Sequence, residues 1–148
     1  EACRINRRSK VIQVIENEAR ARVLEAILDR RQPPNLRGLL QMDARTFYGY
    51  GQSGTAAERQ RDENYALAWG LVYFLRKATH LYKDTNYAAL CPAVIETVVQ
   101  QRGNRGSTNQ AVANIIDFDQ LTEDFVDFWT DNSDRKKAER RHLFKKAR

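Results

Sequence analysis

The chain has 148 residues, of which 42% are hydrophobic and 30% are charged, and its net charge is +6. This length fits one domain with a buried core, and the composition is that of a globular protein rather than a disordered one. The longest nearly apolar stretch, Tyr65 to Leu75, is about half as long as a membrane span must be, so we expect no transmembrane segment.

The positive charge is concentrated at the C-terminal end of the chain. Residues 135–148 hold eight Lys or Arg residues and one acid, Glu139, so this segment carries +7 and leaves −1 for residues 1–134. We therefore divide the chain into a helical domain, 1–134, and a basic C-terminal helix or tail, 135–148.

The first predicted element is a helix from about Lys10 to Arg31, with Ser9 as its N-cap. Its apolar residues recur every three or four positions, which is the period of a helix with one buried face. The pair Pro33–Pro34 ends it, because neither ring can donate a helical hydrogen bond.

Two short helical turns and a loop follow. Asn35 and Asp43 are placed to cap the turns, because their side-chain oxygens can accept from the free backbone N–H groups of a helix start. The loop is marked by three glycines: Gly49, Gly51 and Gly54.

The longest predicted helix runs from about Ala56 to Ala78. Its first turns are polar, and from Tyr65 onward it is apolar on nearly every side, which is typical of a helix at the centre of a fold. We therefore predict an all-α bundle of six or seven helices around it. The predicted core residues are Trp69, Leu71, Val72, Phe74, Leu75, Leu90, Val94, Val98, Phe125 and Trp129.

Three further helices are predicted in the second half of the chain. They cover residues 87–101, 108–116 and 121–130, with a glycine-containing loop over 102–107 and Asp119 as the cap of the last helix. No segment shows sustained alternation with a period of two, so we expect no strands.

Neither the two histidines nor the two cysteines have the spacing of a metal or redox site. His80 and His142 are 62 positions apart, so no helix carries the His-Glu-x-x-His pair of a zinc peptidase, and surface histidines are the simpler interpretation. Cys3 and Cys91 lack metal-ligand spacing; two free thiols are the favoured interpretation, and a disulfide between them is the alternative.

Two other patterns have ordinary structural explanations. The glycine-rich stretch 49–54 lacks the Lys-Ser/Thr pair of a phosphate loop, which favours a simple connection. The acids Asp117, Asp119, Glu123, Asp124 and Asp127 could form a cation site, but they surround a predicted helix start, where carboxylates stabilise the free N–H groups.

The basic tail could contact nucleic acid or another anionic partner through phosphate groups, or could simply be a solvated helix end. Its candidate contact residues are Arg135, Lys136, Lys137, Arg140, Arg141, Lys145 and Lys146.

One stretch has a sequence pattern that is more specific than its amino-acid composition. The segment 64–75 (NYALAWGLVYFL) resembles the Tyr-Ala-x-(Ala/Ser)-Trp-x-Leu-Val-x-Phe-Leu helix of the peptidase-MA-like group, which are bacterial gluzincin-type zinc peptidases. Upstream, 34–48 resembles that family's Pro-x-Leu-x-x-Leu-Leu segment with its following Phe-Tyr. Downstream, 117–129 resembles its closing helix. The resemblance covers about residues 33–130.

The resemblance implies a chain without the catalytic metal. In the family, the His-Glu-x-x-His helix and a third ligand, a Glu, precede the region matched here, so zinc is implied only for an upstream segment and no cofactor for this chain. Gluzincins also place a Tyr downstream of the third ligand, where its hydroxyl supports the oxyanion of the substrate. Tyr65 occupies a similar position; its alternative role is that of a core tyrosine with a surface hydroxyl.

Three functions remain open from the sequence. The leading one is a non-catalytic helical part of a gluzincin-like zinc peptidase, which forms one wall of a substrate cleft with an upstream metallopeptidase-like domain and contacts the peptide substrate. The second is a helical module that binds nucleic acid or an acidic protein through its basic tail. The third is an interaction domain that buries an apolar face against another protein.

Overall fold

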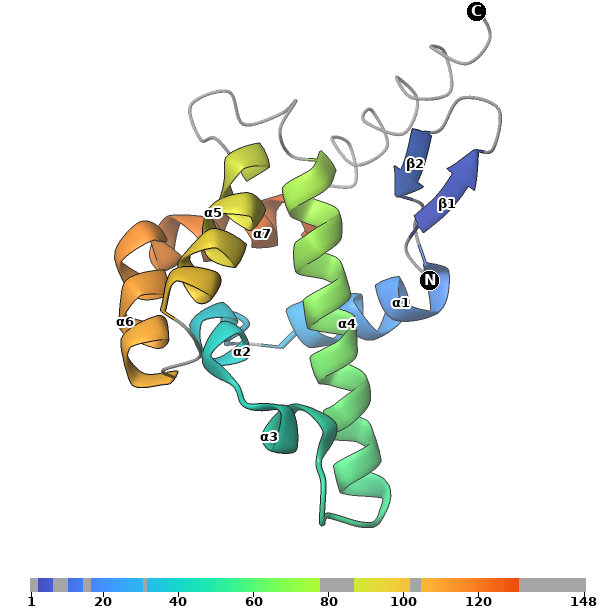
Figure 1. Cartoon of the computed structure of the whole chain (residues 1–148). Coiled ribbons are helices and arrows are strands. Elements are labelled where there is room, and N and C mark those ends of the chain that lie inside the picture. The colour runs from blue at the N-terminus through green and yellow to red at the C-terminus, as the bar shows by residue number, and fades with distance from the viewer. Residues whose placement is uncertain are drawn as a thin grey trace, which may run out of the picture. The chain divides into compact units, whose positions relative to one another are not determined.

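The computed structural model describes residues 3–6, 11–14, 17–30, 32–77, 87–101 and 105–130. Within these ranges the chain forms seven helices and one two-stranded antiparallel sheet (Figure 1). The predicted all-α class is confirmed, with a short hairpin added. The elements are β1 (Cys3–Asn6), β2 (Val11–Val14), α1 (Glu18–Leu28), α2 (Leu36–Gln41), α3 (Ala44–Tyr48), α4 (Thr55–Lys77), α5 (Tyr87–Gln100), α6 (Arg105–Ile115) and α7 (Phe118–Thr130).

The chain divides into two compact units, one up to Tyr73 and one from Phe74 onward. The division falls inside α4, so this helix contributes its first nineteen residues to the first unit and its last four to the second. The predicted basic helix or tail, 135–148, lies outside the described residues, and the predicted boundary at residue 134 stays a prediction.

The hairpin corrects the prediction of a helix from Lys10. Residues 11–14 pair with 3–6 in the register Cys3 to Val14 and Asn6 to Val11. Two causes explain the error: β-branched residues dominate the segment VIQV and favour an extended chain, and a better helix cap follows it. The Asn17 side chain accepts a hydrogen bond from the backbone N–H of Arg20 at 3.2 Å, and α1 therefore begins at Glu18.

The predictions for α2 and α3 are confirmed, together with their caps. The Asn35 side chain accepts from the Gly38 N–H at 2.7 Å, and the Asp43 carboxylate accepts from the Thr46 N–H at 2.6 Å. Gly49 ends α3 in the left-handed region with φ of 66°, where a residue with a side chain would be strained.

The core of the first unit lies where α1 and α2 meet the apolar part of α4. α1 presents residues three positions apart, and α4 changes from exposed polar turns to buried apolar ones after Glu63. The buried apolar residues of this unit are Ala21, Leu24, Ile27, Leu36, Leu39, Ala66, Trp69, Leu71 and Tyr73.

The second unit has an aromatic core in which Phe74 is central. Its ring lies 4.9 Å from that of Tyr87, 5.8 Å from Phe125 and 5.3 Å from Phe128, all in edge-to-face geometry. Such pairs contribute about 0.5–1.5 kcal/mol each beyond their burial. Phe128 also packs edge-on against Trp129 at 5.5 Å, so α7 supplies most of this core.

Most of the predicted core is confirmed, and two positions are wrong. Six of the ten predicted residues are buried, and Leu90 and Val94 are half-buried. Val72 is 46% exposed and Val98 is 42% exposed. Val72 lies on the exposed side of a helix that is apolar in sequence all round, so a pattern without a polar side could not identify it.

The last two helices begin earlier than predicted. α6 begins at Arg105 and includes residues 105–107 of the predicted loop. The cap of α7 is Asp117 rather than Asp119: its Oδ1 accepts the backbone N–H groups of Asp119 and Gln120, both at 3.1 Å. Separately, none of the helices in the described ranges combines the length and the apolar character that crossing a bilayer requires.

Candidate functional site

Tyr65, the residue singled out by the resemblance, lies in an aromatic cluster of the first unit. Its ring is 5.2 Å from that of Phe47 and 6.0 Å from that of Tyr48, and the Arg20 guanidinium carbon lies 5.3 Å above it. Tyr48 continues the cluster to Tyr50, whose ring is 5.3 Å away. The Tyr65 side chain is half-buried, whereas Tyr50 is 62% exposed.

Two neighbours contact the ring of Tyr65. Phe47 packs edge-on against it and the Arg20 guanidinium lies above it, and both contacts favour the observed orientation of the side chain. Within the part of the chain that the structure describes, no group forms a hydrogen bond with the Tyr65 hydroxyl. A positioned phenol with an unused O–H can donate to a ligand.

Asn64, which is only 3% exposed, fixes the aromatic cluster to α4. Its amide nitrogen donates to the backbone carbonyl of Phe47 at 3.1 Å and contacts the sulfur of Met42 at 3.5 Å, while its oxygen accepts from Gln60 at 3.1 Å. A buried amide with partners for both ends resists rotation. The residue next to Tyr65 therefore links the backbone of α3 to α4.

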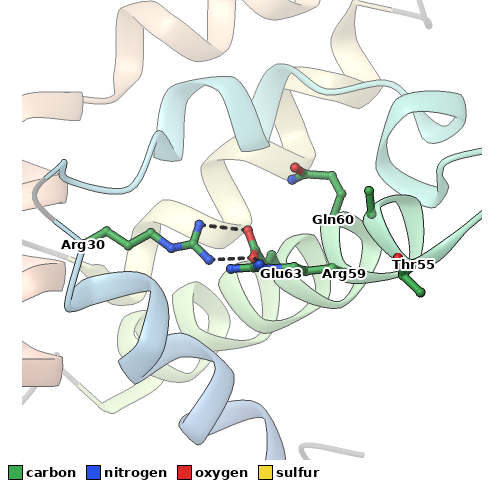
Figure 2. A pocket seen from close by; sticks show the side chains of 6 residues that line it. Arg30, Thr55, Arg59, Gln60 and Glu63 are labelled. Carbon is green, nitrogen blue, oxygen red and sulfur yellow. Dashed lines mark hydrogen bonds and ion pairs between the residues drawn. The ribbon is translucent and has the colours of Figure 1, made fainter.

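A second feature of the first unit is a hollow of about 540 Å³ beside the start of α4 (Figure 2). Its lining consists of Arg30, Thr55, Ala56, Arg59, Gln60 and Glu63. Arg30 follows the end of α1, and the other five belong to α4. The hollow is therefore formed by two elements that are distant in sequence.

Glu63 is the centre of the charges in this hollow. Both terminal nitrogens of Arg30 donate to its two oxygens, at 3.0 and 2.6 Å, and Arg59 Nε donates to Oε1 at 3.0 Å. The Arg30 guanidinium first, and Arg59 as well, lower the pKa of the Glu63 carboxyl, and burial of the carboxyl opposes them. The same hydrogen bond raises the pKa of Arg30 further.

The second unit has a polar cluster with a buried pair, Tyr87 and Asp124, and one exposed member, Gln120. The Tyr87 hydroxyl donates to Asp124 Oδ2, and the Gln120 amide donates to Asp124 Oδ1 at 3.0 Å. Tyr87 begins α5 and Asp124 lies in α7, and their exposures are 3% and 8%. This cluster joins the two helices, and its donors are satisfied within the protein.

The acid cluster predicted around α7 is divided among different roles. Asp117 caps the helix and Asp124 binds Tyr87, as above, while Asp119, Glu123 and Asp127 are exposed. Across the described ranges, no three His, Cys, Asp or Glu side chains are arranged to hold a metal ion.

Several predicted residues belong to other parts of the chain. His80, His142 and the basic tail residues from Arg135 to Lys146 lie outside the described ranges. Cys91 is half-buried in α5 with a free thiol, and burial raises the pKa of this thiol while Arg76 partly lowers it. The side chain of Cys3 also lies outside the described ranges.

The hollow was not found from the sequence. Arg59 and Glu63 are four positions apart on one helix, which is a readable ion-pair pattern. Arg30 comes from 33 residues away, and nothing local indicates that its side chain meets Glu63.

Comparison with known proteins identifies no relative for this chain. No protein-family model matches it, and neither the curated proteins nor the solved structures contain a significant match.

Proposed function

We propose that this chain is a helical part of a gluzincin-like zinc peptidase that lacks the zinc-binding motif, and that the surface around Tyr65 forms one wall of a substrate cleft. The proposal rests on the resemblance of residues 33–130, and one structural observation carries it: a positioned tyrosine whose hydroxyl has no hydrogen-bond partner in the described chain. In such enzymes zinc supplies the Lewis acid for hydrolysis, and this role belongs to an upstream segment.

The contribution of the chain itself is a hydrogen bond. As a peptide carbonyl is attacked by water, negative charge develops on its oxygen, and a donor fixed in advance stabilises that charge without reorganising. Tyr65 is restrained by Phe47 and Arg20, so its O–H group suits this role. Arg20 adds a positive charge near the same ring, which favours an anionic transition state.

The test uses the chain together with whatever sequence its gene encodes before Glu1. We expect a His-Glu-x-x-His motif within about a hundred residues upstream, stoichiometric zinc, and peptide hydrolysis by the purified protein. Replacing Tyr65→Phe should lower kcat by about 100-fold with little change in KM or melting temperature, because loss of one oxyanion donor has an effect of this size.

The matched control is Tyr50→Phe, since Tyr50 belongs to the same run of rings and is mostly exposed. It should leave kcat unchanged. If Tyr65→Phe lowers the melting temperature and the activity in parallel, the tyrosine is a packing residue only. If no zinc motif precedes the chain and no peptide is cleaved, the peptidase proposal fails.

A second candidate function follows from the charge distribution. Residues 135–148 carry +7 while the rest of the chain carries −1, which favours contact of this segment with nucleic acid or an acidic protein. Binding to random-sequence DNA should then weaken by about 1000-fold between 50 and 200 mM salt and disappear when 135–148 are deleted. Binding that is insensitive to salt, or that survives the deletion, would exclude this function.

A further inference from the structure

The hollow beside the start of α4 has more positive than negative groups in its lining. Two guanidinium groups, those of Arg30 and Arg59, share the single carboxylate of Glu63, so the lining carries +1. A carboxylate with two guanidinium partners neutralises only one of them. The remaining charge faces an open space of about 540 Å³, which is large enough to admit a small ionic group.

Arg59 has donors that the internal contact does not use. Only its Nε binds Glu63, and across the described chain no group accepts a hydrogen bond from its two terminal amino groups. Its side chain is 74% exposed, whereas that of Glu63 is only 13% exposed. Glu63 is thus fixed beneath Arg59, and the terminal amino groups remain available as a fork that matches the two oxygens of a carboxylate or phosphate.

Two further groups favour an anion at the same place. Thr55 lies in the lining, and this residue starts a 23-residue helix whose N-terminal end bears partial positive charge. The residue before it, Gly54, accepts the N–H groups of Ala57 and Glu58 through its backbone carbonyl and has no side chain that could cap the helix. These features add to the positive charge of the two guanidinium groups, which is the main attraction for an anion.

Nearby acidic side chains limit the affinity of the hollow for an anion. The adjoining hollow toward α1 is lined by Arg22, Glu58 and Asp62 in addition to the three charges already described, so positive and negative groups balance there. The excess positive charge is therefore confined to the side of Thr55 and Gln60. An anion should bind weakly, with a Kd of about 1 mM.

We propose that this hollow is a binding site for an oxyanion group, a phosphate or a carboxylate of a small ligand. Arg59 and Arg30 contact the anion, and Glu63 both orients the two guanidinium groups and competes with the ligand for them. The site is independent of Tyr65, so it stands or falls separately from the peptidase proposal.

The experiment titrates the full chain with inorganic phosphate and, separately, with acetate, at constant ionic strength maintained with chloride. Binding is followed by NMR of the arginine Nε–H groups and of the backbone amides of Thr55 and Ala56. We expect saturable shifts with at least one of the two anions, and the tighter one identifies the phosphate or the carboxylate source. Shifts that do not saturate, or that chloride produces equally, would overturn the proposal.

Three variants locate the site. Arg59→Gln should weaken binding by at least about 5-fold, because it removes a charge-assisted fork. Arg61→Gln removes the same charge from an exposed position of α4 that does not line the hollow, and it should leave the Kd unchanged. Glu63→Gln removes the competing carboxylate and should tighten binding several-fold.

The direction of the Glu63 effect separates a binding site from a purely structural ion pair. In a structural pair, Glu63→Gln would release the arginines and leave no saturable binding in a protein that still folds by circular dichroism. Equal weakening by Arg59→Gln and Arg61→Gln would show general charge attraction instead of a site, and this comparison stands even if Glu63→Gln fails to fold.

Discussion

Glu63 and Asp124 are two carboxylates with the same kind of task in opposite surroundings. Each receives side-chain donors from two residues and joins helices: Glu63 links the end of α1 to α4, and Asp124 links α5 to α7. The partners of Glu63 are exposed arginines beside an open hollow, whereas Asp124 and Tyr87 are both buried. Water can replace a lost partner of Glu63, whereas it does not reach the buried Tyr87–Asp124 pair at the second cluster.

The comparison teaches which cluster can also serve a ligand. At Asp124 both donors are neutral; Gln120 is exposed, but the Tyr87 hydroxyl is buried, and removing its Asp124 acceptor is costly. At Glu63 the donors are charged, solvated and in excess over the carboxylate. The Glu63 contact costs less free energy to break, so it is the one in which a ligand can replace a partner.

The largest expected effect comes from the buried side. Asp124→Ala should lower the free energy of unfolding by about 2–4 kcal/mol, because the Tyr87 hydroxyl and the Gln120 amide lose their shared acceptor. Asp127→Ala, at an exposed position of the same helix, should change it by less than about 0.5 kcal/mol. Urea unfolding followed by circular dichroism measures both. Equal effects would remove the contrast between the two clusters.

The smaller effect comes from the open side and depends on pH. The pKa of Glu63 is lowered in the folded state. The stabilisation from its ionised carboxylate is therefore complete above the unfolded-state pKa of about 4.3, and it is lost as pH falls through the lower folded-state pKa. Glu63→Gln should therefore lower the free energy of unfolding by about 1 kcal/mol at pH 7 and by progressively less toward pH 3.

Chemical unfolding at a series of pH values tests this, with Glu58→Gln as an exposed control in the same helix. A difference between Glu63→Gln and the unmodified chain that stays constant from pH 7 to pH 3 would mean that the carboxylate charge has no part in the contact.

What could be predicted from the sequence was local. The caps Asn35 and Asp43 are correct because a cap and its target N–H lie three residues apart, so the signal is contained in a short segment. The apolar half of α4 was recognised for the same reason. The hairpin was missed because helical periodicity and β-branched composition both fit 11–14, and pairing with 3–6 decided between them.

The candidate sites could not be predicted from the sequence in full, because tertiary contacts form them. Tyr65 was selected by resemblance. The residues that contact its ring, Arg20 and Phe47, lie 45 and 18 positions away in sequence, and the resemblance did not indicate them. The Arg30–Glu63 contact crosses 33 residues. The exposed side of α4 at Val72 was also missed, because an all-apolar helix gives no sequence signal for which side faces water.

The connection between α3 and α4 has a consequence for chirality. Gly49 and Gly54 adopt φ of 66° and 98°, and a β-carbon on either would meet no atom within 4 Å. The obstacle to a side chain is therefore handedness and not space: an L-residue strains the backbone there, whereas a D-alanine would fit the same dihedral angles. Chemical synthesis with D-alanine at these two positions would restrict φ to the positive values that the chain already has there.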